Sequence, residues 1–238
     1  IMLAIDVSTS MLAEDLKPNR LEAAKDVAAE FINGRPNDNI GITLFAGETF
    51  TQCPLTVDHA VLLDMIHNIK CGLIEDGTAV GMGVANAVTR LKDSKAKSKV
   101  VILLTDGTNN KGDISPLTAA EIAKSFGIRV YTIGVGTNGM APYPYPVGNT
   151  VQYINMPVEI DEKTLTQIAG TTDGNYFRAT SNSKLKEVYE EIDKLEKTKL
   201  NVKEYSKREE DYRWFALAAF LCVLLEVLLR NSILKKIP

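Results

Sequence analysis

The chain opens on Ile1-Met2-Leu3-Ala4-Ile5-Asp6-Val7-Ser8-Thr9-Ser10, an apolar run followed by polar side chains at alternate positions. An apolar run of this length predicts a strand buried on both faces of a sheet. Asp6, Ser8 and Ser10 follow at a spacing of two, and alternate side chains of an extended segment point to the same side. Their oxygen atoms are therefore expected to converge just past the end of this strand.

A second strand carries another carboxylate at the same kind of place. Val100-Val-Ile-Leu-Leu-Thr-Asp-Gly107 is apolar as far as Thr105 and then reaches Asp106. Between the two strands, Thr78 lies in the glycine-bracketed loop Glu75-Asp-Gly-Thr-Ala-Val-Gly81, which is able to bring a hydroxyl in from the side. Ligands of open α/β sheets bind beyond the carboxyl ends of strands where the strand order reverses, so we expect Asp6 and Asp106 to meet there.

The expected donors are all oxygen atoms: Asp6, Ser8, Ser10, Thr78 and Asp106. A set without histidine or cysteine suits a hard cation, so Mg²⁺ or Mn²⁺ fits better than zinc, with Ca²⁺ as a further candidate. Magnesium takes about six oxygen ligands and normally keeps some waters. At least one coordination position would remain for a ligand, such as an Asp or Glu of a partner protein.

The rest of the chain alternates apolar runs with amphipathic segments. The spacing predicts strands at 1–7, 40–45, 49–55, 100–105, 129–135 and 175–178, and helices at 21–32, 58–69, 81–91, 117–126, 162–169 and 185–195. Strands 40–45 and 49–55 are too close for a crossover and suit a hairpin. We therefore expect an α/β fold with a doubly wound, mostly parallel six-stranded Rossmann-like sheet, with 49–55 as an antiparallel edge strand.

Residues 137–157 interrupt this alternation. They contain Met140-Ala-Pro-Tyr-Pro-Tyr-Pro146 and then Thr150-Val-Gln-Tyr-Ile154. A long ordered insertion is more often functional, or a small hairpin, than a mere linker. Two interpretations stay open: a plain proline-rich loop, or a recognition edge near the metal that includes Tyr143 and Tyr145.

Composition narrows the classes of function. A chain of 238 residues, 45% of them apolar, is long enough for one substantial core and an appendage. Its net charge of -3 argues against a nucleic-acid-binding protein, which needs an excess of basic residues. Cys53, Cys71 and Cys222 lack C-x-x-C spacing, so unpaired thiols are expected, although a Cys53–Cys71 disulfide stays open.

The C-terminal region is strongly apolar from Trp214 onward and reaches the roughly 20 residues that a bilayer core requires. We predict a transmembrane helix over 214–234, preceded by a charged juxtamembrane stalk over 197–213 and followed by a short basic tail over 235–238. The basic residues after the span favour a cytoplasmic tail and a main domain outside the cytoplasm. Because the chain begins inside a strand, without Met or a leader, we expect a truncated N-terminus.

The enzymatic alternative is a metal-dependent phosphoryl hydrolase that uses Asp6 and Asp106. Such an enzyme needs an acid/base carboxylate two residues after the nucleophile, and Ser8 stands there. It also needs a catalytic lysine, for which Lys111 is the nearest candidate. The pattern therefore favours a protein without catalytic activity.

Asp6-x-Ser8-x-Ser10, Thr78 and Thr105-Asp106-Gly107 resemble, in this order and spacing, the metal-ion-dependent adhesion site of von Willebrand factor A (VWA) domains. The resemblance implies a VWA domain over residues 1–196. It also implies that the two serines and the threonine, or their waters, ligate the metal and that both aspartates stand at or just behind it.

Three further segments, Asn19-Arg-Leu-Glu-Ala-Ala-Lys25, Leu44-Phe-Ala-Gly-Glu48 and Pro54-Leu-Thr56, resemble the bacterial aerotolerance-operon (BatA-type) membrane proteins. This resemblance implies an interaction module in the bacterial inner membrane, with its A-domain on the extracytoplasmic side. The implied partners are other aerotolerance-operon A-domain and repeat proteins and a MoxR-type AAA+ ATPase. The implied setting is a stress-related envelope complex.

Overall fold

The computed structural model describes residues 1–148, 150–205, 217, 219–223, 225–227 and 229. The chain divides into two units, Ile1–Glu196 and Lys197–Pro238. The first unit contains the sheet and every site described below. In the part of the chain that the structure describes, no helix is both long and apolar enough to cross a membrane. The predicted span at 214–234 falls in part, and the basic tail at 235–238 entirely, outside the described residues.

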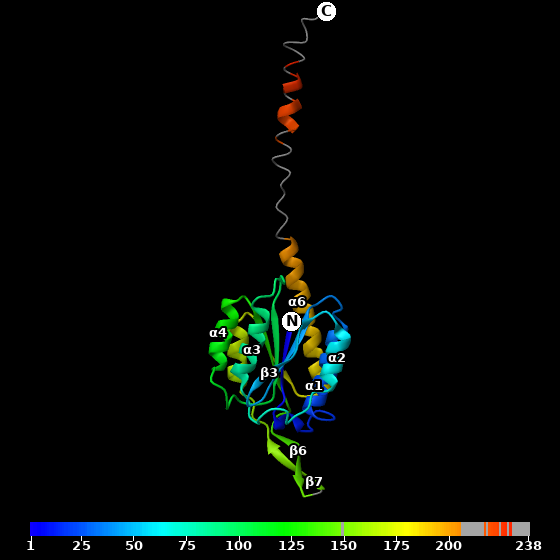
Figure 1. Cartoon of the computed structure of the whole chain (residues 1–238), viewed down its shortest axis with the longest axis vertical. Coiled ribbons are helices and arrows are strands. Elements are labelled where there is room, and N and C mark those ends of the chain that lie inside the picture. Colours follow the sequence, from blue (N-terminus) through cyan, green and yellow to red (C-terminus); the bar gives the residue numbers. More distant parts are fainter. Residues whose placement is uncertain (149, 206–216, 218, 224, 228, 230–238) are drawn as a thin grey trace, which may run out of the picture. The chain divides into compact units, whose positions relative to one another are not determined.

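A six-stranded sheet forms the centre of the first unit, in the order β3-β2-β1-β4-β5-β8 (Figure 1). Its strands are β1 (Met2–Asp6), β2 (Ile40–Phe45), β3 (Thr49–Thr56), β4 (Val100–Thr105), β5 (Arg129–Val135) and β8 (Tyr176–Ala179). All neighbours are parallel except β2 and β3, which pair antiparallel at one edge. The predicted sheet and its antiparallel edge strand are confirmed.

Helices cover both faces of the sheet (Figure 1). One face packs against α1 (Arg20–Asn33), α2 (His59–His67) and α6 (Asn182–Tyr205). The other face packs against α3 (Val80–Leu91), α4 (Pro116–Ser125) and α5 (Glu162–Thr171). The first strand shows how the sequence builds this arrangement. Leu3 and Ile5 join the core cluster under α1, whereas Met2 and Ala4 join the cluster under α3, because alternate residues point to opposite faces.

The insertion forms a separate antiparallel hairpin of β6 (Met140–Val147) and β7 (Thr150–Pro157). The plain-loop interpretation is therefore wrong. Its prolines fit a strand because the carbonyl of Pro142 accepts a bond from the Glu14 amide, so the backbone of Pro142 faces away from β7. Pro144 and Pro146 follow at alternate positions, so their backbones face away from β7 as well. The N–H groups that these prolines lack therefore remove no hydrogen bond between β6 and β7.

The last turn of the first unit is bonded to residues at the amino-terminal ends of β4 and β5. Glu196, which is 3% exposed, accepts bonds from Tyr131 (2.6 Å) and Ser98 (3.0 Å) and pairs with Arg129. α6 runs on from there to Tyr205, so the beginning of the predicted stalk is helical. The cysteines Cys53, Cys71 and Cys222 are all free thiols, and the Cys53–Cys71 disulfide is excluded.

Candidate metal centre

The carboxyl ends of β1 and β4 lie side by side, because Ile5 pairs with Leu104 in parallel register. This places Asp6 next to Thr105, whose hydroxyl donates a 2.6 Å bond to Oδ2 of Asp6. Oδ1 of the same carboxylate accepts a 2.9 Å bond from the amide of Ser8. Asp6 is completely buried, and these two bonds fix its orientation.

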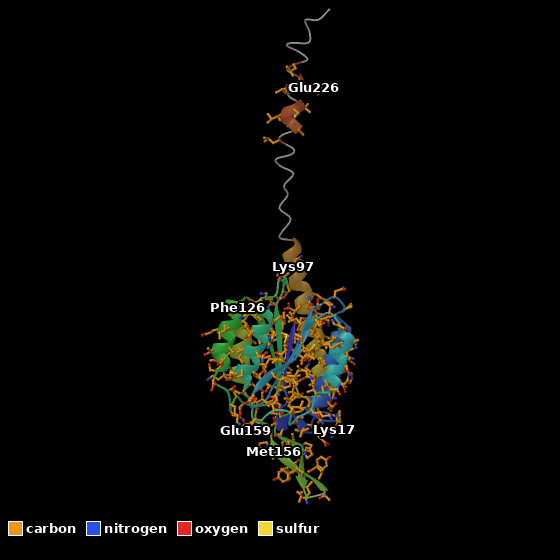
Figure 2. The ribbon with its side chains drawn as sticks, in the orientation of Figure 1. Lys17, Lys97, Phe126, Met156, Glu159 and Glu226 are labelled. Carbon is orange, nitrogen blue, oxygen red and sulfur yellow. The ribbon has the colours of Figure 1, made fainter. Side chains whose placement is uncertain are left out.

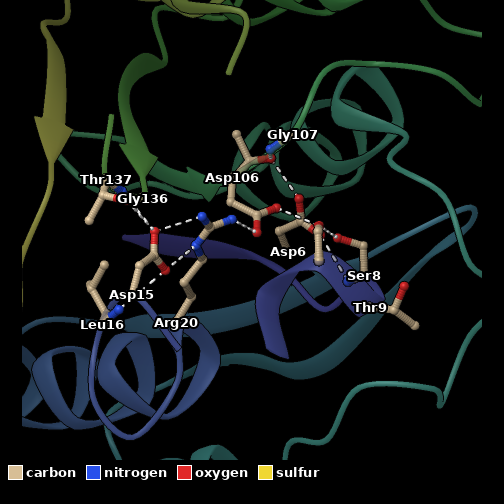
Figure 3. A network of polar contacts seen from close by, with 12 residues as sticks. Asp6, Ser8, Thr9, Asp15, Leu16, Arg20, Asp106, Gly107, Gly136 and Thr137 are labelled. Atoms are coloured by element: carbon tan, nitrogen blue, oxygen red, sulfur yellow. Dashed lines mark hydrogen bonds and ion pairs between the residues drawn. The ribbon is translucent and has the colours of Figure 1, made fainter. Parts of the chain in front are cut away.

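The hydroxyl of Ser10 joins the two strand ends. It lies 3.0 Å from the hydroxyl of Ser8 and donates a 2.7 Å bond to Oδ1 of Asp106. Ser8 and Ser10 flank the start of a single 3-10 turn, η1 (Thr9–Leu12), which turns the chain back over the sheet. The structure thus brings four of the five predicted donors, Asp6, Ser8, Ser10 and Asp106, into one polar cluster. Figure 3 shows Asp6, Ser8 and Asp106 within it.

The fifth predicted donor, Thr78, approaches from the loop before α3. Its backbone is held by Asn110, whose side chain accepts from the Thr78 amide at 2.9 Å and whose amide donates to the Thr78 carbonyl at 3.0 Å. A Cβ at Gly107 would lie 3.2 Å from the Thr78 hydroxyl, so that hydroxyl stands against the residue following Asp106. No sequence motif indicated that Asn110 would anchor this loop.

The rim of the cluster is closed by a contact between Thr9 and Asp76. The amide and hydroxyl of Thr9 donate to the two carboxylate oxygens of Asp76, at 3.0 and 2.8 Å. Asp76 lies two residues before Thr78, so this pair ties the serine-bearing turn to the threonine-bearing loop. These two hydrogen bonds help to hold the hydroxyls of Ser8 and Ser10 in position relative to the hydroxyl of Thr78.

Arg20 is a further residue of this centre whose role no sequence motif indicated. Nη1 of Arg20 donates to Oδ2 of Asp106 at 2.6 Å, while Nε and Nη2 bind both oxygens of Asp15 at 2.7 Å (Figure 3). Asn19 caps α1 by accepting from the amide of Glu22, which places Arg20 in the first turn. Asp15 also accepts a 2.7 Å bond from the amide of Thr137, just before the hairpin.

The charges of the centre are not balanced by the protein alone. Burial, and then repulsion from Asp106, raise the pKa of Asp6 to about 7. Burial also raises the pKa of Asp106, against the opposing attraction of Arg20. Two buried carboxylates with raised pKa values favour either a proton or a bound cation between them.

The donor chemistry fits a hard divalent cation. Among the described residues, no group of three or more His, Cys, Asp or Glu side chains is placed to hold a metal. A metal at this cluster would therefore depend on the hydroxyls of Ser8, Ser10 and Thr78 beside the two carboxylates. Oxygen-only sets of this kind suit Mg²⁺ and Mn²⁺.

The model of the von Willebrand factor type A domain family matches residues 1–191. The chain belongs to this family. Its VWA domain includes the complete sheet and all five predicted metal donors.

Solved structures extend this VWA relationship. The chain is 33% identical to BatB from Bacteroides thetaiotaomicron, with a TM-score of 0.72 over 82% of this chain and 98% of that one. An aerotolerance-related membrane protein from Bacteroides fragilis is also 33% identical, with a TM-score of 0.70 over 81% and 98% of the two chains. The resemblance to aerotolerance proteins is confirmed.

A UPF0353 protein of Mycolicibacterium paratuberculosis is 30% identical over 79% of this chain. The chain spans 58% of that relative's length. A more distant structure, proximal thread matrix protein 1 of the mussel byssus, holds zinc in its metal-ion-dependent adhesion site. It is 25% identical, with a TM-score of 0.62 over 82% of this chain and 44% of the mussel chain.

Proposed function

We propose that this VWA domain binds a partner protein through a Mg²⁺ ion bridged to an Asp or Glu side chain of that partner. The observation that carries the proposal is the Ser10 hydroxyl, which contacts both Ser8 and Asp106 and so gathers donors from two strand ends at one point. Asp6, Ser8, Ser10, Thr78 and Asp106 would hold the ion directly or through water.

The Lewis acidity of the ion supports an acidic ligand. Asp6 and Asp106 balance a dication, and Asp15 balances Arg20, so the centre is formally neutral once the metal is bound. A dication held by hydroxyls and only two carboxylates stays electrophilic and can still accept a carboxylate from a partner. When bound, the metal supplies an electrophilic anchor for one oxygen of that carboxylate.

Magnesium is proposed over the zinc seen in the mussel protein because this donor set has no nitrogen or sulfur. Mn²⁺ and Ca²⁺ are the alternatives that share the same preference for oxygen. Cys71 lies near the centre, but its thiol donates to the carbonyl of Ser8 at 3.4 Å, and burial keeps its pKa well above the usual range. A protonated thiol of this kind is a poor zinc ligand.

The proposal includes no catalysis. The hydrolase alternative requires an acid/base group at Ser8, which is a hydroxyl that contacts Ser10 instead. Its candidate lysine, Lys111, is paired with Glu75 on the rim. These two contacts support the proposal of a non-catalytic site.

The proposed setting is the bacterial inner membrane, with 214–234 as an anchor, 197–213 as the stalk and the VWA domain on the extracytoplasmic side. The name of the Bacteroides fragilis relative, an aerotolerance-related membrane protein, supports this setting. The proposed partners are other aerotolerance-operon A-domain and repeat proteins and a MoxR-type AAA+ ATPase.

The test is capture of partners from native membranes by the purified full chain, with Mg²⁺ or with a chelator. We expect specific capture in Mg²⁺ and its loss in chelator and in Asp6→Ala, while circular dichroism shows that the variant remains folded. Ser10→Ala, which removes one hydroxyl and no charge, serves as the milder second variant.

Capture that survives both the chelator and Asp6→Ala would contradict the proposal. A separate assay addresses the enzyme class with p-nitrophenyl phosphate as substrate. Magnesium-dependent turnover by the pure protein, lost in Asp6→Asn, would overturn the non-enzymatic conclusion.

A further inference from the structure

The β6–β7 hairpin places apolar side chains next to the proposed metal position. Ala141 pairs with Met156 and Tyr143 with Ile154, and these residues share one face of the hairpin with Tyr145. Figure 2 shows the hairpin extending from the domain, with Met156 at the end nearest the sheet. This apolar face forms one wall of a pocket, and residues of η1 contribute to the opposite wall.

The pocket has a volume of about 280 Å³ and is open to solvent on one side. Its hairpin wall includes Tyr143, Ile154 and Met156, and its opposite wall includes Thr9 and Ser10. Ser10 is also the hydroxyl that joins the two strand ends of the metal centre. The pocket and the metal position are therefore neighbouring parts of one surface.

The pocket is suited to an apolar occupant. Arg20 is the cationic residue of its lining, but Asp15 and Asp106 already bind Nε, Nη1 and Nη2 of this guanidinium. Arg20 is only 3% exposed, so it offers little charge to an incoming group. Ile154 and Met156, by contrast, keep 41% and 44% of their surface exposed. Burial of such side chains by an apolar partner is favourable.

The size of the pocket indicates a single side chain. Pockets for drug-sized molecules usually measure about 300–1,000 Å³, and this one lies just below that range. Strand addition at the nearby edge of β6 is disfavoured, because Pro142, Pro144 and Pro146 have no N–H to offer there. Recognition in the pocket would therefore depend on the partner's side chain and not on backbone pairing.

We propose that this pocket determines which acidic segment binds, by taking a large apolar side chain that stands two residues from the Asp or Glu on the metal. The inference rests on the proposed function, since the metal fixes the acidic residue. Residues i and i+2 of an extended segment lie on the same side, roughly 6.6–6.8 Å apart, and so can reach two neighbouring positions on one surface. A methionine and two tyrosines in the wall suit aromatic and long aliphatic occupants alike.

The test uses a random displayed peptide library, bound to the purified full chain in Mg²⁺ and eluted with chelator. We expect enrichment of peptides in which an Asp or Glu stands two positions from Phe, Tyr, Trp, Leu or Met. An enriched peptide should bind Ile154→Gln/Met156→Gln about tenfold or more weakly than wild type. Val147→Gln/Val151→Gln is the matched control, since both residues are exposed on the same hairpin and neither lines the pocket.

Three results would overturn this inference, and they can be told apart. Chelator-eluted peptides with an acidic residue but no apolar preference would leave the metal-bridged function intact and exclude the pocket's role. Failure to recover any chelator-eluted peptide would contradict the proposed function itself. Concentration-dependent self-association, lost in Ile154→Gln/Met156→Gln, would identify a second copy of this chain as the occupant and would also overturn the inference.

Discussion

Arg20 connects the proposed metal centre to the rest of the domain. Its guanidinium is buried between two carboxylates, with the side chains of Asp15 and Asp106 only 2% and 0% exposed. Through Asp15 it reaches Thr137, immediately before the hairpin. One side chain thus supports both the orientation of Asp106 and the attachment of the hairpin.

Replacing Arg20 should destabilise the domain strongly. Removing one partner of a buried ion pair leaves an uncompensated charge, and we expect Arg20→Ala to lower the free energy of unfolding by about 3–5 kcal/mol. Urea denaturation of the full chain measures this. Lys184→Ala, which removes an exposed pair with Glu187, is the control and should have little effect. Equal stability of both variants would show that Arg20 is not held as described.

The raised pKa of Asp6 predicts a pH dependence of metal binding. Between pH 3.8 and about 7 the metal-free native state holds a proton on Asp6 that the unfolded chain, with its ordinary pKa of 3.8, has released. The stability that protonated Asp6 contributes to the metal-free fold is therefore lost as the pH rises toward 7. A cation must displace that proton, so Mg²⁺ should bind more tightly as pH rises through this range.

Calorimetric titration of Mg²⁺ in buffers of different ionisation enthalpy measures both effects. We expect proton release near pH 6 and almost none well above 7. Asp161→Asn is the control, because hydrogen bonds from Thr164 keep the pKa of Asp161 below its usual range and it lies outside the centre. Affinity independent of pH between these limits would contradict the assignment of Asp6.

Two glycines lie within helices, one in close contact with another segment and one without a neighbouring atom. In α3, a Cβ at Gly81 would lie 2.0 Å from the carbonyl oxygen of Ile114, so the helix and the segment before α4 approach at a glycine. In α5, a Cβ at Gly170 would meet nothing within 4 Å. The same substitution should therefore have opposite effects at these two positions.

We expect Gly81→Ala to destabilise the domain by about 1–3 kcal/mol through overpacking. Gly170→Ala should stabilise it by at most about 0.5–1 kcal/mol, because alanine is the better helix former. Thermal or urea unfolding of both variants distinguishes them. A stabilising Gly81→Ala would show that α3 has room at this contact.

Most elements were predictable because their residues repeat at the period of a strand or a helix. α1 shows this, since Leu21, Ala24, Ala28, Phe31 and Ile32 are all buried as their spacing predicted. The hairpin was less certain because proline at alternate positions is typical of loops. A strand over these prolines is predictable only if the backbone of Pro142 is known to face away from β7. That orientation is shown by its hydrogen bond with the amide of Glu14, a tertiary contact.

The chain as a whole is expected to be membrane-bound. The full chain should remain in the pellet after alkaline carbonate extraction of bacterial membranes. Protease added to intact spheroplasts should degrade the VWA domain, whereas sealed inverted vesicles should protect it. Degradation only in inverted vesicles would place the domain on the cytoplasmic side instead.

A matched pair of variants tests the anchor within the same experiment. Leu221→Arg/Leu225→Arg should release the chain, because each arginine at the centre of a span costs about 2.5–3.5 kcal/mol. Phe126→Arg also replaces an exposed apolar side chain with arginine, but at the end of α4, and should remain membrane-bound. Retention of the double variant would contradict an anchor at 214–234.

The sequence by itself determined the sheet and the five proposed donors. Both follow from local properties: apolar runs set the strands, and Asp6, Ser8 and Asp106 mark the ends of two of them. Only the tertiary structure decided what surrounds these donors. Arg20 meets Asp106 across 86 positions, and Asp15 meets Thr137 across 122. Such contacts, like the apolar pocket beside Ser10, arise from the packing of distant segments, which no local periodicity records.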